Sequence, residues 1–161
     1  MSDELALLGR MLDHLAWADE RVARALAAAD SVPPATLTLM AHLVAAEHIW
    51  HARLTGTTPA HPVWPTLSLE QATRLGRATV EALRSLVASM SLDDLHRGVS
   101  YANSTGTRFT TPAIDIVTHL CLHGAYHRGQ IATTVRQAGG VPISTDYIQF
   151  VRETVTPPAP R

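Results

Sequence analysis

GTTPAHPVWPTL, residues 56–67, is a proline-rich connection between two segments whose apolar residues recur at helical period. A chain of this length spans roughly 40 Å when it is fully extended. The helix that precedes it, of about 19 residues, would be about 28 Å long. Because antiparallel neighbours in a bundle usually need far shorter loops, the connection predicts a crossover from one end of a helical bundle to the other.

Four long helices are predicted on the two sides of this connection. Each has an apolar stripe at helical spacing and is bounded by residues typical of helix ends. Ser68 is expected to cap the third helix, and Thr111 to cap the fourth with Pro112 in its first turn. The predicted helices cover residues 3–29, 35–54, 68–90 and 111–138.

Smaller elements complete the predicted fold. A short helical turn is expected at residues 91–95, a β-hairpin around an Asn-Ser-Thr-Gly turn at residues 98–112, and a last short helix at residues 144–153. The fold class is therefore all-α: a four-helix bundle with a long crossover between its second and third helices, a small hairpin and a short C-terminal helix. We expect one domain over residues 1–155 and a flexible tail over 156–161.

The composition is that of a globular protein and excludes several function classes. The chain has 161 residues, of which 46% are hydrophobic and 17% charged, and its net charge is −1. No charge excess would draw it to nucleic acid or an anionic membrane, and no apolar run approaches the roughly 20 residues of a membrane span. The N-terminal residues include two acids and no basic region, so we expect no signal peptide. Because Cys121 is the only cysteine, we expect a reducing, cytoplasmic location.

Nine histidines stand out against this composition, since histidine is the commonest metal ligand. His119, His123 and His127 follow one another at intervals of about one helical turn, so neighbouring members can reach the same metal. A site also needs a ligand from another helix, and the second helix offers His42 or His48, which lie about 240° apart around it and cannot both face one centre. The alternative is that these histidines are merely hydrogen-bonded in the core. The remaining histidines read as surface or loop residues: His14, His51, His61 and His96.

Several stretches resemble the DinB/YfiT-like family, and together they cover nearly the whole chain. The last long helix and the segment after it, residues 119–153, follow the pattern H-x3-[NH]-x3-HRGQ-I in HLCLHGAYHRGQI. Residues 41–56, AHLVAAEHIWHARLTG, resemble the second-helix pattern H-x4-E-x2-W-x5-G. MLDHLAWADERV, residues 11–22, resembles the family's first helix, and VSYANSTGTRF, residues 99–109, its hairpin.

The resemblance implies a four-helix bundle with a long crossover, in agreement with the loop length. It also implies one divalent metal, bound by His42 of the second helix and by the pair His123 and His127 of the last long helix. His119 would pack beside this site or support it. Glu47 lies about 140° around its helix from His42, so we expect it to contact a neighbouring helix or Arg128 rather than the metal. Imidazole ligands suit zinc, nickel, copper or iron, and zinc or nickel is our first expectation.

Three ligands leave a coordination position open, which is typical of a catalytic metal. Several relatives of the family are thiol-dependent transferases or isomerases. The resemblance therefore implies a metal that activates a low-molecular-weight thiol, such as mycothiol, bacillithiol or glutathione, for transfer to a small-molecule electrophile. The alternatives are a metal-dependent hydrolase, a non-catalytic stress-linked metal or ligand-binding module, and a structural protein with buried histidines. No general base is evident near His123 or His127 in the sequence, so the catalytic residues stay unassigned.

Two further expectations concern a cysteine and the assembly. Cys121 lies about 200° around its helix from the nearest predicted ligand, so it should be neither a ligand nor a nucleophile. Members of the family commonly form homodimers, and the first helix carries more apolar residues than one core-facing stripe requires, so we expect a C2 homodimer. The alternative is that Leu7 and Met11 pack under the C-terminal segment around Ile148 and Phe150.

Overall fold

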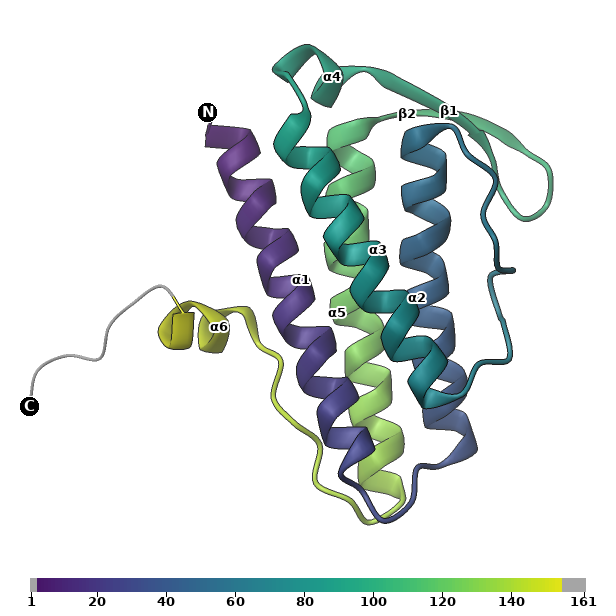
Figure 1. Ribbon diagram of the computed structural model, residues 1–161, viewed down its shortest axis with the longest axis vertical. Helices are drawn as coiled ribbons and strands as arrows, with labels where there is room; N and C mark the ends of the chain where they lie inside the picture. The colour runs from purple at the N-terminus through teal and green to yellow at the C-terminus, as the bar shows by residue number, and fades with distance from the viewer. Residues whose placement is uncertain (1–2, 155–161) are drawn as a thin grey trace, which may run out of the picture.

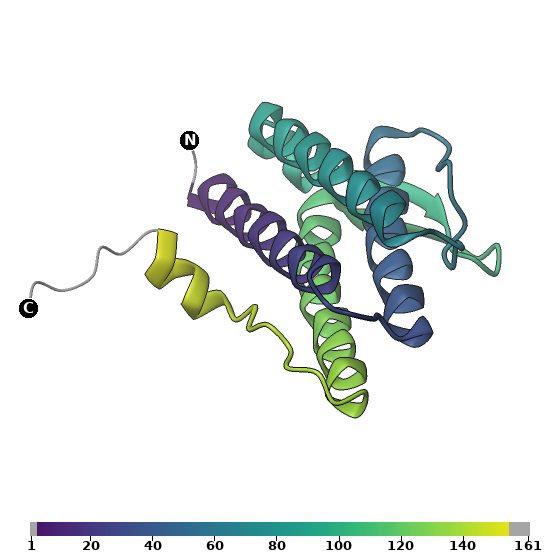
Figure 2. The same ribbon diagram turned by 60° about the horizontal axis from the view of Figure 1, so that its bottom comes forward.

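The computed structural model describes residues 3–154, so the predicted tail at residues 156–161 lies outside the described residues. The structure is mostly helical and includes a two-stranded antiparallel hairpin (Figures 1 and 2). In chain order its elements are α1 (Asp3–Ala27), α2 (Pro34–Thr55), α3 (Leu69–Ser89), α4 (Leu92–His96), β1 (Gly98–Ala102), β2 (Arg108–Pro112), α5 (Ala113–Gln137) and α6 (Tyr147–Thr154).

The four long helices α1, α2, α3 and α5 form the predicted bundle. In Figure 1, α2 and α3 run in the same direction, and the connection between them passes along the outside of α2 from one end of the bundle to the other. Helices α1 and α5 run the opposite way. The all-α bundle with a crossover, a hairpin and a short C-terminal helix is therefore confirmed.

Local hydrogen bonds and backbone geometry define both ends of the crossover. Helix α2 ends at Gly56, whose φ of 69° is in the left-handed region that favours glycine. Helix α3 begins with a capping box, in which Ser68 Oγ accepts from the backbone N–H of Gln71 and the Gln71 side chain accepts from the backbone N–H of Ser68. The chain thus leaves α2 and enters α3 at positions that the sequence itself specifies.

The predicted start of the fourth long helix is wrong by two residues. Thr111 does not cap it, because Thr111 belongs to β2 and pairs with Val99 of β1. Helix α5 begins at Ala113, and Pro112 is its N-cap residue without a side-chain cap hydrogen bond. Pairing within the hairpin therefore keeps Thr111 extended.

The C-terminal segment packs against α1 through His14. The prediction of a surface position for His14 is wrong, because its side chain is buried and its Nε2 donates to the Thr145 carbonyl at 2.8 Å. Its ring also contacts the rings of Tyr147 and Phe150, at centroid distances of 5.2 and 5.6 Å. Because this contact engages the backbone just before α6, the helix begins at Tyr147 rather than at residue 144.

The apolar core consists of two clusters of buried residues. The larger one joins α1, α3 and α5 to α4 and the hairpin: Leu8, Leu12, Leu15, Leu54, Val80, Leu83, Val87, Leu95, Val99, Ala113, Ile116, Val117, Leu120 and Cys121. The smaller one joins all four long helices: Val22, Ala23, Leu26, Met40, Leu43, Val44, Ala72 and Ile131. Helices α2 and α5 contribute to both clusters, so their faces are fixed relative to each other.

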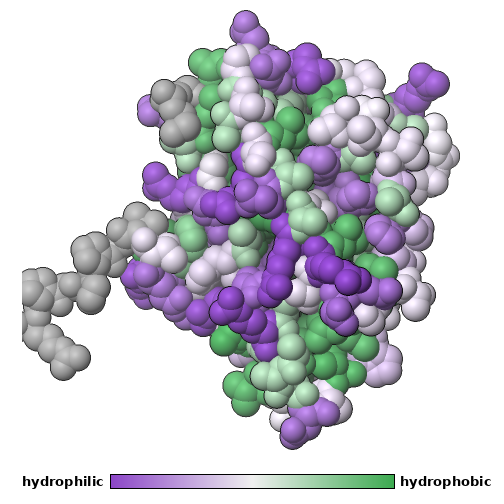
Figure 3. Space-filling model, viewed as in Figure 1, coloured by the Kyte–Doolittle hydropathy of each residue, from purple (hydrophilic) through white to green (hydrophobic). Residues whose placement is uncertain are grey.

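The surface over α1 and α3 is polar at mid-height. Figure 3 shows a band of hydrophilic side chains across the middle of this face. Two ion pairs connect the helices there, Asp13–Arg84 at 2.6 Å and Glu20–Arg77 at 2.8 Å. Within residues 3–154, no helix combines the length and the hydropathy needed to cross a bilayer.

Candidate metal centre

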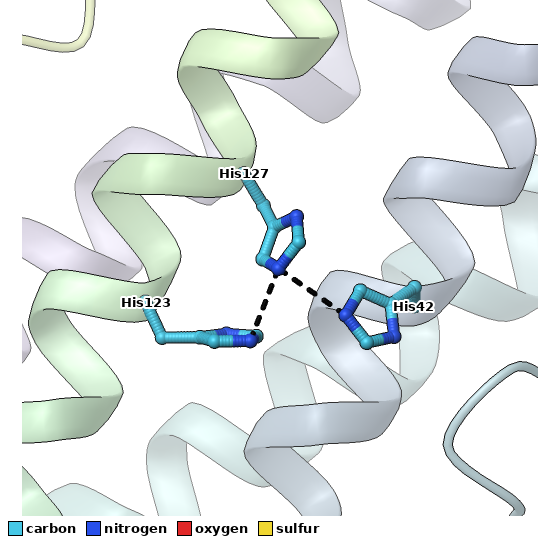
Figure 4. A group of neighbouring side chains, drawn as sticks. All are labelled: His42, His123 and His127. Carbon is cyan, nitrogen blue, oxygen red and sulfur yellow. Dashed lines mark hydrogen bonds between the residues drawn. The ribbon is translucent and has the colours of Figure 1, made fainter.

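Three histidine rings converge between α2 and α5 (Figure 4). His42 Nε2 lies 3.2 Å from His127 Nε2, which lies 3.0 Å from His123 Nε2. All three candidate ligand atoms lie within 4.8 Å of one another. In the part of the chain that the structure describes, this is the one group of three or more metal-ligating side chains that converges so closely. The predicted residues are therefore brought together.

The crossover orients His42. Its Nδ1–H donates to the Val63 carbonyl at 2.8 Å, so its Nε2 presents a lone pair toward the other two rings. The indole of Trp64 stacks on the imidazole with a centroid distance of 3.7 Å and an interplanar angle of 10°. The long connection between α2 and α3 thus supports one ring of the site as well as joining the helices.

His127 is oriented from within α5. Its Nδ1–H donates to Gln130 Oε1 at 2.7 Å, and Gln130 Nε2 donates to Tyr126 Oη at 3.2 Å. His127 Nε2 therefore also presents a lone pair. The Nδ1 of His123, by contrast, is buried and has no hydrogen-bond partner among the described residues.

The protonation of these rings suits metal binding. Burial lowers the pKa of His123 to about 4, with further lowering by His127, His119 and His42. Burial is also the main cause that lowers the pKa of His127. Neutral imidazole is the form that binds a metal.

The spacing of the nitrogens also fits a metal ion. Ligands that lie about 2.0–2.1 Å from a tetrahedral ion are about 3.3 Å apart, close to the two nitrogen–nitrogen distances in the site. If the Nε2 atoms of His42, His123 and His127 all present lone pairs, they repel one another unless a cation lies between them. The three residues can therefore hold a metal ion.

Other sequence candidates lie beside this group or elsewhere. His119 is exposed, and its ring lies 5.3 Å from that of His123 and 5.2 Å from that of Trp50. His48 lies outside the group, as the helical geometry predicts, and its Nε2 accepts from the backbone N–H of Ala60 at 3.0 Å. Glu47 is fully buried and lies near Asp19 of α1 and Arg128 of α5, in agreement with its predicted contact with a neighbouring helix.

The sequence reasoning missed the residues that support the rings. Trp64 is 57% exposed and stacks on His42, a contact that nothing in the proline-rich connection indicates. Gln130 follows His127 by three residues, and that spacing is a signal that could have identified it. The contact of Val63 with His42 has no such local signal, because it depends on the path of the crossover.

The fold and the histidine group define a helical-bundle protein with a site that can hold a metal ion. A family model described as the DinB family matches residues 1–159. The chain therefore belongs to the DinB family. Comparison with curated proteins finds no match.

Proposed function

We propose that the protein binds one divalent transition metal through His42, His123 and His127, with zinc or nickel as the native ion. The observation that carries the proposal is the convergence of three Nε2 atoms from two helices, two of them fixed by hydrogen bonds at Nδ1. Membership of the DinB family supports it. Three imidazoles leave at least one coordination position for a ligand from solution.

We further propose that this position serves a thiol-dependent transfer reaction on a small-molecule electrophile. When bound, the metal would lower the pKa of a coordinated low-molecular-weight thiol, so that the thiol reacts as a thiolate. The chain's own part is to hold the ligands neutral and oriented and to shape the entrance. The large, exposed side chains next to the group, Trp64 at 57% and Tyr126 at 64%, are aromatic and favour an apolar or aromatic electrophile.

Adduct formation tests this function. Zinc- or nickel-loaded protein is incubated with mycothiol, bacillithiol or glutathione and a chlorinated aromatic electrophile, and the thioether product is quantified by mass spectrometry. We expect product with at least one of these thiols and none above background with His127→Ala. Equal product with and without the protein for every thiol would contradict the transferase proposal and favour a non-catalytic stress-linked metal- or ligand-binding module.

A metal-dependent hydrolase is the second candidate within the enzyme class. Such a reaction also uses an open coordination position, but it usually needs a general base near the metal. In the described part of the chain, the hydrogen-bond partners of the three imidazoles are each other, a backbone carbonyl and an amide, and none is a carboxylate. The thiol reaction needs no such base, so we place it first.

A further inference from the structure

A second polar cluster lies inside the bundle, apart from the histidine group. Asp19 of α1, Glu47 of α2 and Arg128 of α5 are 7%, 0% and 2% exposed. Arg128 Nη1 donates to Asp19 Oδ1 at 2.7 Å. The three residues come from three different helices, and two of these helices, α2 and α5, also carry the candidate metal ligands.

The hydrogen bonds of this cluster are incomplete if both acids are ionised. Asp19 Oδ2, both Oε atoms of Glu47, and Nε and Nη2 of Arg128 are buried and have no hydrogen-bond partner in the described residues. Each buried acceptor without a donor destabilises the folded state, and two adjacent carboxylates also repel each other. A proton on Glu47 removes the repulsion and supplies a donor for Asp19, because the carboxyl group of Glu47 can then donate to it. The cluster then holds one anion and one cation.

We propose that Glu47 is neutral in the folded protein and acts as a positioning residue. Its carboxyl group donates to Asp19, and this hydrogen bond ties α2 to the Asp19–Arg128 ion pair, which joins α1 to α5. Arg128 directly follows His127, and Glu47 lies five residues after His42. A fixed separation of α2 and α5 at this level therefore keeps His42 facing the two histidines of α5. The inference rests on the proposed metal centre but not on the thiol chemistry.

The surroundings of Glu47 favour its neutral form. Burial raises the pKa of Glu47 well above its usual range, Asp19 raises it further, and Arg128 opposes the rise. The other titratable or charged groups facing the cluster are His14 on α1 and Cys121 on α5, while Arg77 on α3 lines the groove that Asp19 also lines.

Because the pKa of Glu47 is raised in the folded state, its contribution to the stability of the protein should fall as the pH rises. The contribution of Glu47 is fully present below the pKa of an unfolded glutamate, about 4.5, and is lost as the pH rises toward the folded-state pKa. His123 and His127, with lowered pKa values, contribute in the opposite sense. Because these histidines are common to wild type and Glu47→Gln, the difference in melting temperature between the two proteins isolates Glu47.

The first experiment measures that difference from pH 6 to pH 8 on full-length, zinc-loaded protein, because acid below about pH 6 is expected to release the metal. Glutamine keeps the size of Glu47 and can donate to Asp19, but it cannot ionise. We expect Glu47→Gln to gain roughly 3–5 °C in melting temperature over wild type for each pH unit above about 5. The matched control is Glu70→Gln, at an exposed glutamate on α3, whose difference from wild type should not change with pH.

The second experiment measures the metal site itself. Zinc affinity is determined by competition with a chelator, and the visible absorption of Co²⁺-loaded protein reports the coordination geometry. Glu47→Gln should keep zinc affinity within about twofold and leave the cobalt spectrum unchanged. Glu47→Leu fills the space but cannot donate, so it should weaken zinc binding at least tenfold and alter the spectrum, the range seen for outer-shell residues. Glu47→Met serves the same purpose if the leucine variant does not fold.

If the difference in melting temperature between wild type and Glu47→Gln does not change with pH, the proposal that Glu47 is neutral is wrong. Wild-type zinc affinity and an unaltered cobalt spectrum in Glu47→Leu or Glu47→Met would overturn its positioning role. These results are separable from a failure of the proposed function. Absence of thiol adducts changes neither measurement. If the wild-type protein binds no metal, the positioning role is wrong, and the same melting series on metal-free protein still decides whether Glu47 is protonated.

Discussion

At the scale of single residues, the candidate site depends on atoms that would not touch the metal. The lone pairs of His42 and His127 point inward because the other nitrogen of each ring donates to Val63 or to Gln130. The Nδ1 of His123 has no such partner in the described residues, so its ring is held by packing and by its contact with His127 Nε2. The three ligands are therefore not equivalent.

Removal of a ligand should abolish metal binding. Purified protein is expected to carry close to one divalent ion per chain, measured by atomic emission, and His127→Ala should carry none. His119→Ala is the matched control, because His119 is exposed, is on the same helix and lies beside the ring of His123 without belonging to the converging group. Full occupancy in His127→Ala, or loss in His119→Ala alone, would show that the ligand assignment is wrong.

Replacement of the single cysteine should leave the metal in place. Cys121 is buried in the larger core cluster, and burial raises the pKa of its thiol to about 12, so it has no thiolate at neutral pH. We expect Cys121→Ala to keep full metal occupancy and to lose about 1 kcal/mol or somewhat more in free energy of unfolding, as for a small core truncation. Loss of metal in a folded Cys121→Ala protein would contradict this prediction.

Acid should release the metal by protonating its ligands. In metal-free protein, an NMR titration of His123 should give a midpoint near 4, because burial and the neighbouring imidazoles disfavour its charged form. Removal of one neighbour in His127→Ala should raise this midpoint. Metal should leave only below about pH 6, because the lowered pKa values of His123 and His127 keep both imidazoles neutral near pH 6.5, where unperturbed imidazoles take up protons. A His123 midpoint near 6.5 would mean that its ring is not buried as described.

Spacing along one helix indicated that neighbours among His119, His123 and His127 could share a metal, because such spacing is a local property, and the family resemblance then implied the set His42, His123 and His127. The contacts that hold these residues in place were harder to predict from the sequence. Whether Glu47 meets Asp19, or Val63 meets His42, depends on the rotation and separation of elements that are far apart in the chain. The sequence favoured a contact of Glu47 with a neighbouring helix or Arg128, but nothing in it indicated Asp19 or the proton.

At the scale of elements, α1 and α5 approach closely at Gly124. A Cβ added there would lie 2.6 Å from Leu15 Cδ1 and 2.9 Å from Arg128 Nη1. Leu15 is fully buried, so it has little room to move. The absence of a side chain at this position therefore sets the distance between the two helices and leaves space for the Asp19–Arg128 ion pair.

Two glycine substitutions on α5 should have opposite effects on stability. Gly124→Ala should destabilise the protein by about 1–3 kcal/mol, because the methyl group overpacks a buried contact. Gly129→Ala should stabilise it by about 0.5–1 kcal/mol, since a Cβ there meets nothing within 4 Å and alanine favours the helix. Urea denaturation measures both. Equal effects of the two substitutions would mean that helix propensity, not packing, dominates at Gly124.

At the scale of the whole molecule, the crossover was predictable because chain length alone limits how a connection can run. The boundaries that failed, at Thr111 and before Tyr147, are both places where a tertiary contact competes with a local helix signal. The hairpin holds Thr111, and α1 holds the backbone before Tyr147 through His14. Helix propensity is a weak preference that such contacts override.

Assembly is the remaining prediction at this scale. The C-terminal segment covers the part of α1 around His14 and Trp17, because Phe150 is only 5% exposed and its ring contacts the rings of both. It does not cover all of it, since Leu7 is 52% exposed and Ile148 on α6 is 54% exposed. Exposed apolar side chains on neighbouring elements favour an interface, and a twofold dimer is the commonest kind.

Light scattering at micromolar concentration, with metal bound, should therefore give twice the 17.4 kDa of one chain. Leu7→Glu places a charge in the predicted interface and should give the mass of one chain. Val141→Glu is the matched control, because Val141 is 93% exposed and lies in the stretch between α5 and α6, beside the C-terminal end of α1, whereas Leu7 is near the N-terminal end, so the mass of this variant should equal that of wild type. A wild-type mass of one chain would rule out the dimer, and a dimeric Leu7→Glu protein would move the interface away from this end of α1.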